Sequence, residues 1–299
     1  MGGWFALNGN GEMTGTAWLD ESGFAEGPIG ITNTHSVGVV RDALVAWLVK
    51  RDRRPIRWYM PIVAETYDGR LNDIDGMHVK PAHVFAALRN ARGGPVAEGN
   101  VGGGTGMICH QFKGGIGTAS RKLGRPDGGW TVGVLVQANY GLKRCLTIAG
   151  VPVGRELIAV EADMKAARDT GSIIILVATD APLLPHQCKR LARRAGGMGL
   201  ARLGSFAANS SGDIFLAFST GNSGAARAQA KRVKLDMLPN AALDPLFEAT
   251  VQATEESILN ALVAARDMQG INAFRVRALP HEQVRAILRK YNRLCSTSL

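Results

Sequence analysis

Hydrophobic positions along the 299-residue chain recur with two spacings, one typical of strands and one of helices. The short apolar runs 130–137, 172–178 and 214–219 are rich in Val, Ile and Leu, as buried strands are. Val40, Leu44, Trp47 and Leu48 instead follow a helical period, and the segments 81–91, 185–194, 244–266 and 282–291 also predict helices. These elements do not alternate with the regular rhythm of a doubly wound sheet. They predict an α/β (α+β) single domain over residues 1–299, with central sheets covered by helices.

Composition narrows the class of protein. Apolar residues make up 46% and charged residues 20%, and no apolar run approaches the length of a membrane span, about 20 residues. The first ten residues lack the pattern of a secretory signal, so we expect a cytoplasmic protein. The cysteines are far apart and form no metal-ligand spacing, which predicts reduced thiols and no metal site. They are Cys109, Cys145, Cys188 and Cys295.

A net charge of +10 raises the possibility of nucleic-acid binding. However, aromatic residues are only 6%, and the basic residues 189–194 fall on a helix-like run with apolar residues interleaved. A solvated helix face explains them better, so we expect neither nucleic acid nor a membrane as a partner.

Glycines concentrate in residues 98–120, where eight occur in 23 residues. The spacing does not match GxxxxGK[ST], and no acidic residue follows at the distance that a dinucleotide-binding unit requires. Nucleotide binding is therefore disfavoured. The glycines predict instead a backbone that passes close to a ligand or to another sheet. Cys109 lies in this segment, and a buried thiol is the more ordinary interpretation than a nucleophile.

None of the six histidines lies in a GxSxG or HExxH context, so a hydrolase here would use another base. Two Gly-Ser pairs, Gly171-Ser172 and Gly204-Ser205, offer a different kind of nucleophile. We favour Ser205, because it follows a glycine-punctuated helix end and precedes a predicted strand. A serine released there by self-cleavage could use its own α-amine, with a reference pKa of about 7.7–8.0, as general base.

The chain resembles the L-aminopeptidase/D-esterase family, which includes the β-peptidyl aminopeptidases. The similarity runs in one order through nearly the whole chain, over residues 31–34, 63–69, 98–109, 112–121, 132–141, 149–154, 177–187, 204–222 and 253–262. It implies an αββα four-layer sandwich, like that of the N-terminal-nucleophile hydrolases but with distinct connectivity. It also implies autocleavage into chains 1–204 and 205–299, a homotetramer of αβ units, and small peptides, amino-acid amides or esters as substrates. No cofactor is implied.

The same resemblance assigns roles to individual residues. Ser205 would be the nucleophile after Gly204, and Asn139 would donate to the oxyanion. Glu65 would pair with the free amino group of the substrate, which explains removal of N-terminal residues. Thr254 and Glu256 would orient the new α-amine.

His110 stands where the family often has a tyrosine, so it would contact substrate in place of that hydroxyl. Relatives in that family also carry a segment before the position of Met1, and residues 2–15 resemble an interior strand and turn of the family.

Two other classes of function stay open at this level. An acyltransferase could use a related self-cleaving scaffold, as the ornithine acetyltransferases do, although those use threonine as nucleophile. An uncut and inactive basic binding protein would also be consistent with the charge.

Overall fold

The computed structural model describes the chain except for residues 52–57, 161–170, 227–230 and 295–299. Its centre is a five-stranded sheet in the order β1-β9-β8-β7-β6. These strands are Gly2–Gly9, Gly212–Ser219, Ser172–Thr179, Thr131–Asn139 and Gly115–Lys122. The neighbours β8 and β9 run parallel, and the other pairs are antiparallel.

Alternate residues of the central strands belong to two different hydrophobic cores, one on each face of the sheet. Ile173, Ile175 and Val177 of β8 belong to the larger core, together with residues of α5 (Pro185–Arg194) and α6 (Asp244–Ala264). Ile174 belongs to a second core on the opposite face, as the period of two in a strand requires. Both faces of the sheet are therefore covered.

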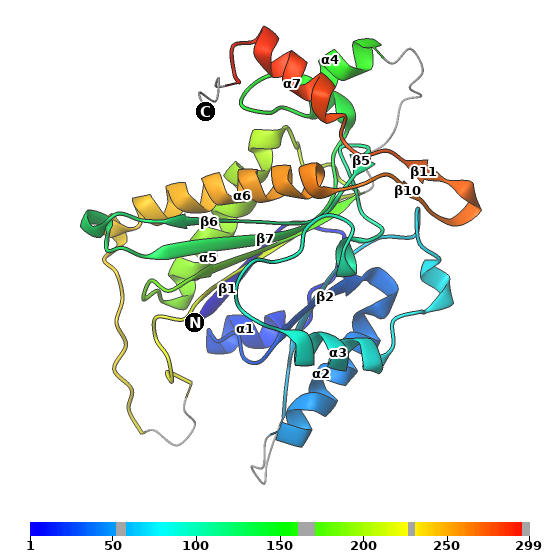
Figure 1. The fold of residues 1–299 in the computed structure, drawn as a ribbon. Coiled ribbons are helices and arrows are strands. Elements are labelled where there is room, and N and C mark those ends of the chain that lie inside the picture. The colour runs from blue at the N-terminus through cyan, green and yellow to red at the C-terminus, as the bar shows by residue number, and fades with distance from the viewer. Residues whose placement is uncertain (52–57, 161–170, 227–230, 295–299) are drawn as a thin grey trace.

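The second core lies between this sheet and a parallel pair of strands, β2 (Ile29–Asn33) and β3 (Ile62–Thr66). The outer side of that pair packs on α2 (Val37–Arg51) and α3 (Pro81–Asn90). Figure 1 shows the result, with α6 on one side of the five-stranded sheet and α2 and α3 on the other side of the molecule. The predicted αββα sandwich is confirmed.

Shorter elements complete the chain. They are α1 (Thr16–Ser22), α4 (Val153–Val160), α7 (His281–Lys290), β4 (Ile108–Cys109), β5 (Phe112–Lys113), β10 (Met268–Gln269) and β11 (Arg275–Val276). No helix in the described part of the chain is long and apolar enough to cross a membrane. Cys109, Cys145 and Cys188 form no disulfide with one another, and Cys295 lies outside the described residues.

The sequence patterns located α2, α3, α5, α6 and α7 but not α1, α4 or β6, and a strand at β1 was indicated only by the family resemblance. Strand β6 contains residues 115–120 of the glycine-rich segment, in which Ile116 is the one large apolar residue, and its Gly117 packs against α6. A Cβ atom there would lie 1.9 Å from the main-chain oxygen of Ser257. The glycine is thus required by close packing of helix on strand, which is the close approach that the glycine content predicts.

Candidate active site

The ends of several strands meet at one edge of the five-stranded sheet. Asn139, the last residue of β7, is paired with Ser172, the first residue of β8. Ser172 is paired in turn with Gly212, the first residue of β9, and Gly212 with Gly9 at the end of β1. The order of these strands in the sheet brings together residues that are far apart in the sequence.

A pocket of about 340 Å³ opens at this edge. The end of β3 contributes Glu65 and, just beyond the strand, Tyr67, while β8 contributes Ser172 with the preceding Gly171. The complete lining is Asn10, Gly11, Glu12, Thr34, Glu65, Tyr67, Gly171, Ser172 and Ser210.

Ser172 supplies a buried hydroxyl group to this pocket. It is 4% exposed, and its Oγ has no hydrogen-bond partner among the described residues. Buried hydroxyls are normally hydrogen-bonded, so an unpartnered one beside a pocket is a functional signal. The preceding carbonyl, that of Gly171, accepts a hydrogen bond from the Gly212 N–H at 3.1 Å. This donor polarises the carbonyl that an attacking Ser172 would meet.

Asn139 is held by two hydrogen bonds that define its orientation. Its Oδ1 accepts from the Ile108 N–H at 2.8 Å, and its Nδ2 donates to the carbonyl of Tyr67, also at 2.8 Å. Directly opposed residues in an antiparallel pair project to the same face, with Cβ atoms about 5 Å apart. The Asn139 amide is therefore a fixed neighbour of the Ser172 hydroxyl.

Glu65 supplies a buried carboxylate, only 4% exposed. Oε1 accepts from the Glu12 N–H at 2.9 Å, and Oε2 accepts from the Thr34 hydroxyl. Burial raises the pKa of this carboxyl, and the two hydrogen bonds act in the opposite direction. A cation entering the pocket would compensate the buried charge.

A second buried carboxylate, that of Asp213, lies at the start of β9. Asp213 is 1% exposed and is paired with Ile173, the residue after Ser172. The Ser211 hydroxyl donates to its Oδ1 at 2.7 Å. Sequence patterns did not indicate a functional role for Ser211, Asp213 or Tyr67, and they offered Ser172 only as the less favoured of the two Gly-Ser pairs.

Ser205 lies outside this pocket, and the reason for preferring it is corrected by the structure. Strand β9 begins at Gly212, seven residues later, so Ser205 is not the first residue of a strand. Its Oγ accepts a local hydrogen bond from the Ala207 N–H at 3.1 Å. The arrangement expected there, a serine opening a strand directly after glycine, exists instead at Gly171-Ser172.

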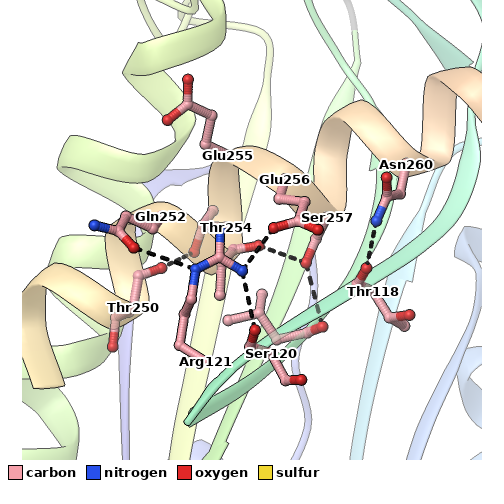
Figure 2. Close-up of polar contacts among 12 residues, drawn as sticks. Thr118, Ser120, Arg121, Thr250, Gln252, Thr254, Glu255, Glu256, Ser257 and Asn260 are labelled. Atoms are coloured by element: carbon pink, nitrogen blue, oxygen red, sulfur yellow. Dashed lines mark hydrogen bonds and ion pairs between the residues drawn. The ribbon is translucent and has the colours of Figure 1, made fainter. Parts of the chain in front are cut away.

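Thr254 and Glu256, the residues expected to orient the α-amine, do not line this pocket. Figure 2 shows Glu256 on α6 directed to Arg121, with a carboxylate–guanidinium distance of 2.6 Å. Arg121 is paired with Val132, so this ion pair lies at the opposite end of β7 from Asn139, about 20 Å away. Thr254 is buried and donates to the Thr250 carbonyl of its own helix at 2.7 Å.

His110 does not line the pocket either. Its ring is fully buried, stacks edge-on against Tyr140 with centroids 5.0 Å apart, and places Nδ1 3.1 Å from the Leu142 carbonyl. Of the predicted site residues, Glu65 lines the pocket and Asn139 is paired with the pocket residue Ser172.

Several proteins with a similar sequence or fold are aminopeptidases. The sequence model of peptidase family S58 matches residues 1–276. The chain is 52% identical over 306 residues to a β-peptidyl aminopeptidase of Sphingosinicella microcystinivorans, covering 98% of this chain and 77% of that protein. A second, from Sphingosinicella xenopeptidilytica, is 45% identical over 299 residues, covering 95% of this chain and 73% of that protein.

Solved structures agree. A β-aminopeptidase of Burkholderia sp. superposes with a TM-score of 0.89 at 52% identity, over 97% of this chain and 81% of that one. The L-aminopeptidase/D-Ala-esterase/amidase of Ochrobactrum anthropi gives 0.90 at 47% identity, over 98% and 82%. It is described as a prototype of the serine aminopeptidases and a new variant of the Ntn hydrolase fold. This chain therefore belongs to peptidase family S58, and it is a serine aminopeptidase with an Ntn-hydrolase-like fold.

Proposed function

We propose that the chain cleaves itself between Gly171 and Ser172, and that the freed Ser172 then removes N-terminal residues from small peptides, amino-acid amides or esters. One observation carries this proposal: the unpartnered Ser172 hydroxyl lies in the same pocket as the buried Glu65 carboxylate. The two mature chains would be 1–171 and 172–299, in place of the division at residue 204 that the sequence resemblance implies.

Self-cleavage would begin with attack of the Ser172 Oγ on the Gly171 carbonyl carbon. The peptide C–N bond breaks, the nitrogen takes up the proton lost by the hydroxyl, and an ester links the two residues. Water then hydrolyses that ester, leaving a carboxylate on Gly171 and a free α-amine on Ser172. The Gly212 N–H, already bonded to the Gly171 oxygen at 3.1 Å, would stabilise the charge that develops there.

The mature site would use the Ser172 α-amine as general base for its own hydroxyl. A terminal amine has a reference pKa of about 7.7–8.0, which suits this task near neutral pH. Asp213, with its Ser211 partner, is the buried carboxylate nearest to Ser172 along β9, and we assign it the task of orienting that amine. Asn139 would donate from Nδ2 to the oxyanion of the substrate, as the resemblance implies.

Glu65 would restrict the enzyme to substrates with a free N-terminal amine, which makes it an exopeptidase. A substrate ammonium in the pocket would pair with this buried carboxylate, whereas a capped N-terminus would leave it desolvated and unpaired. Names of the relatives include β-peptidyl and L-amino-acid substrates, and both classes carry the required free amine. A homotetramer of cleaved chains and a cytoplasmic location stay predictions made from the sequence.

Intact mass of purified variants tests the cleavage site. We expect wild type and Ser205→Ala to give two chains that meet at 171/172, and Ser172→Ala to stay as a single uncut chain. Loss of the nucleophile should lower kcat/KM for an alanine p-nitroanilide by at least about 10⁴-fold, while Ser205→Ala should retain it. A product beginning at Ser205 would refute the proposal.

A further inference from the structure

Lys113 is a fully buried lysine that the proposed mechanism does not use. It ends β5 and has an exposed fraction of 0%. No carboxylate lies within ion-pair distance of its ammonium in the described part of the chain. A buried charge without a counter-ion is costly unless hydrogen bonds replace its lost hydration.

Main-chain carbonyls supply that replacement. The Nζ atom donates to the oxygens of Gly104, Met107 and Gly114, at 3.1, 2.9 and 2.8 Å. All three protons of the ammonium are therefore used. Two of these acceptors precede the turn 108–113 and one follows it, so the Lys113 ammonium holds the two ends of this turn together. Burial lowers the pKa of Lys113 to about 7, whereas the three hydrogen bonds that its Nζ donates favour the charged form.

One of these acceptors connects the lysine to the active site. The Met107 carbonyl and the Ile108 N–H belong to the same peptide group, which is planar and rigid. Its oxygen accepts from Lys113, and its N–H donates to Oδ1 of Asn139 at 2.8 Å. A charged donor on the oxygen polarises the peptide group and strengthens the hydrogen bond from its N–H.

We infer that Lys113 is a positioning residue, which acts through the 107–108 peptide group to hold the Asn139 amide with Nδ2 toward the reacting carbonyl. An Asn side chain can rotate so that its oxygen and nitrogen exchange places. With Oδ1 fixed by the Ile108 N–H, Nδ2 is the donor atom, and it has one proton on the Tyr67 carbonyl and a second proton left for the substrate. This inference rests on the proposed role of Asn139.

A double-mutant cycle tests the connection on the full chain. The variants are Lys113→Met, Asn139→Ala and the combination, with Lys122→Met as the control because Lys122 is exposed on β6. The rate of self-cleavage is measured by intact mass after refolding, and kcat and KM are measured with an alanine p-nitroanilide on the fraction that has been cleaved.

We expect Lys113→Met to lower the cleavage rate and kcat by at least tenfold with KM little changed, and Lys122→Met to resemble wild type. In the Asn139→Ala background, Lys113→Met should change either rate by less than threefold, because the residue it positions is absent. Equal losses in both backgrounds, or no loss in either, would overturn the inference. An unaffected Asn139→Ala would instead overturn the role of Asn139 in the proposed function.

Folding is monitored by near-UV circular dichroism and thermal unfolding for Lys113→Met and for Lys113→Gln, which retains a shorter donor. A folded Lys113→Gln is expected to recover part of the lost rate. If neither variant folds, Lys113 has a purely structural role and the inference is wrong.

Discussion

The main-chain oxygen of Asn139 leaves no space for a side chain on Gly171. A Cβ atom at residue 171 would lie 1.9 Å from that oxygen, far inside van der Waals contact. Asn139 also projects its amide toward the face shared with Ser172, so the residue before the proposed cleavage site and the proposed oxyanion donor are packed together. Glycine at 171 is needed for its carbonyl, at the proposed cleavage site, to lie beside Asn139 and Ser172.

Substitution Gly171→Ala should therefore block or slow self-cleavage. We expect at least tenfold slower appearance of the two chains, because the methyl group must push β8 away from the end of β7. Gly133→Ala on β7 is the matched control, since nothing lies within 4 Å of its added Cβ. Cleavage of Gly171→Ala at the wild-type rate would contradict this packing argument.

Replacing Glu65 by Gln should remove the preference for a free N-terminus. Loss of a charged partner for the substrate ammonium predicts a fall of about 100-fold in kcat/KM for an unblocked amino-acid p-nitroanilide. Comparing rates on the free and the N-acetylated substrate measures this preference directly. Glu21→Gln serves as the control, because Glu21 is exposed on α1. If wild type hydrolyses both substrates equally, Glu65 does not select the amine.

The same substitution should have a pH-dependent effect on stability. Burial raises the pKa of Glu65 in the folded protein, so folding favours its protonated form. The pKa of glutamate in the unfolded chain is about 4.3. As the pH rises from there through the higher pKa of Glu65 in the folded protein, the free energy of unfolding of the wild type therefore falls. Glu65→Gln lacks that loss, so its melting temperature relative to wild type should be higher at pH 8 than at pH 4. A constant difference across this range would show that burial does not perturb Glu65.

Glu256 should contribute little to catalysis. Its ion pair with Arg121 is partly exposed and lies at the far end of the sheet from the pocket. We expect Glu256→Gln to keep kcat/KM within about twofold and to change the free energy of unfolding by at most about 1 kcal/mol, as surface ion pairs do. Steady-state kinetics and urea unfolding check both values. A hundredfold loss of kcat would show that Glu256 takes part in catalysis and would contradict this prediction.

Local patterns in the sequence were enough to predict most of the helices and the strands at 172–178 and 214–219. Their apolar periods directly reflect burial on one or two faces, which a short window of sequence records. Strand β6 was not identified, because packing against α6 requires glycine where an ordinary strand would carry an apolar residue. The family resemblance was likewise contained in contiguous motifs, including those with Glu65 and Asn139.

The choice between the two Gly-Ser pairs depended on tertiary structure. Ser172 opens a strand after a glycine just as was expected of Ser205, but this local feature does not reveal what lies opposite. Strand β8 lies between β7 and β9 in the sheet, and the end of β3 faces the edge at which β8 begins. Ser172 and Glu65, which are 107 positions apart in the sequence, therefore line the same pocket. The sequence by itself determined the family, the layers and two of the side chains in the site. Only the order of the strands decided which serine those side chains surround, because that order is set by long-range packing and not by the residues next to either serine.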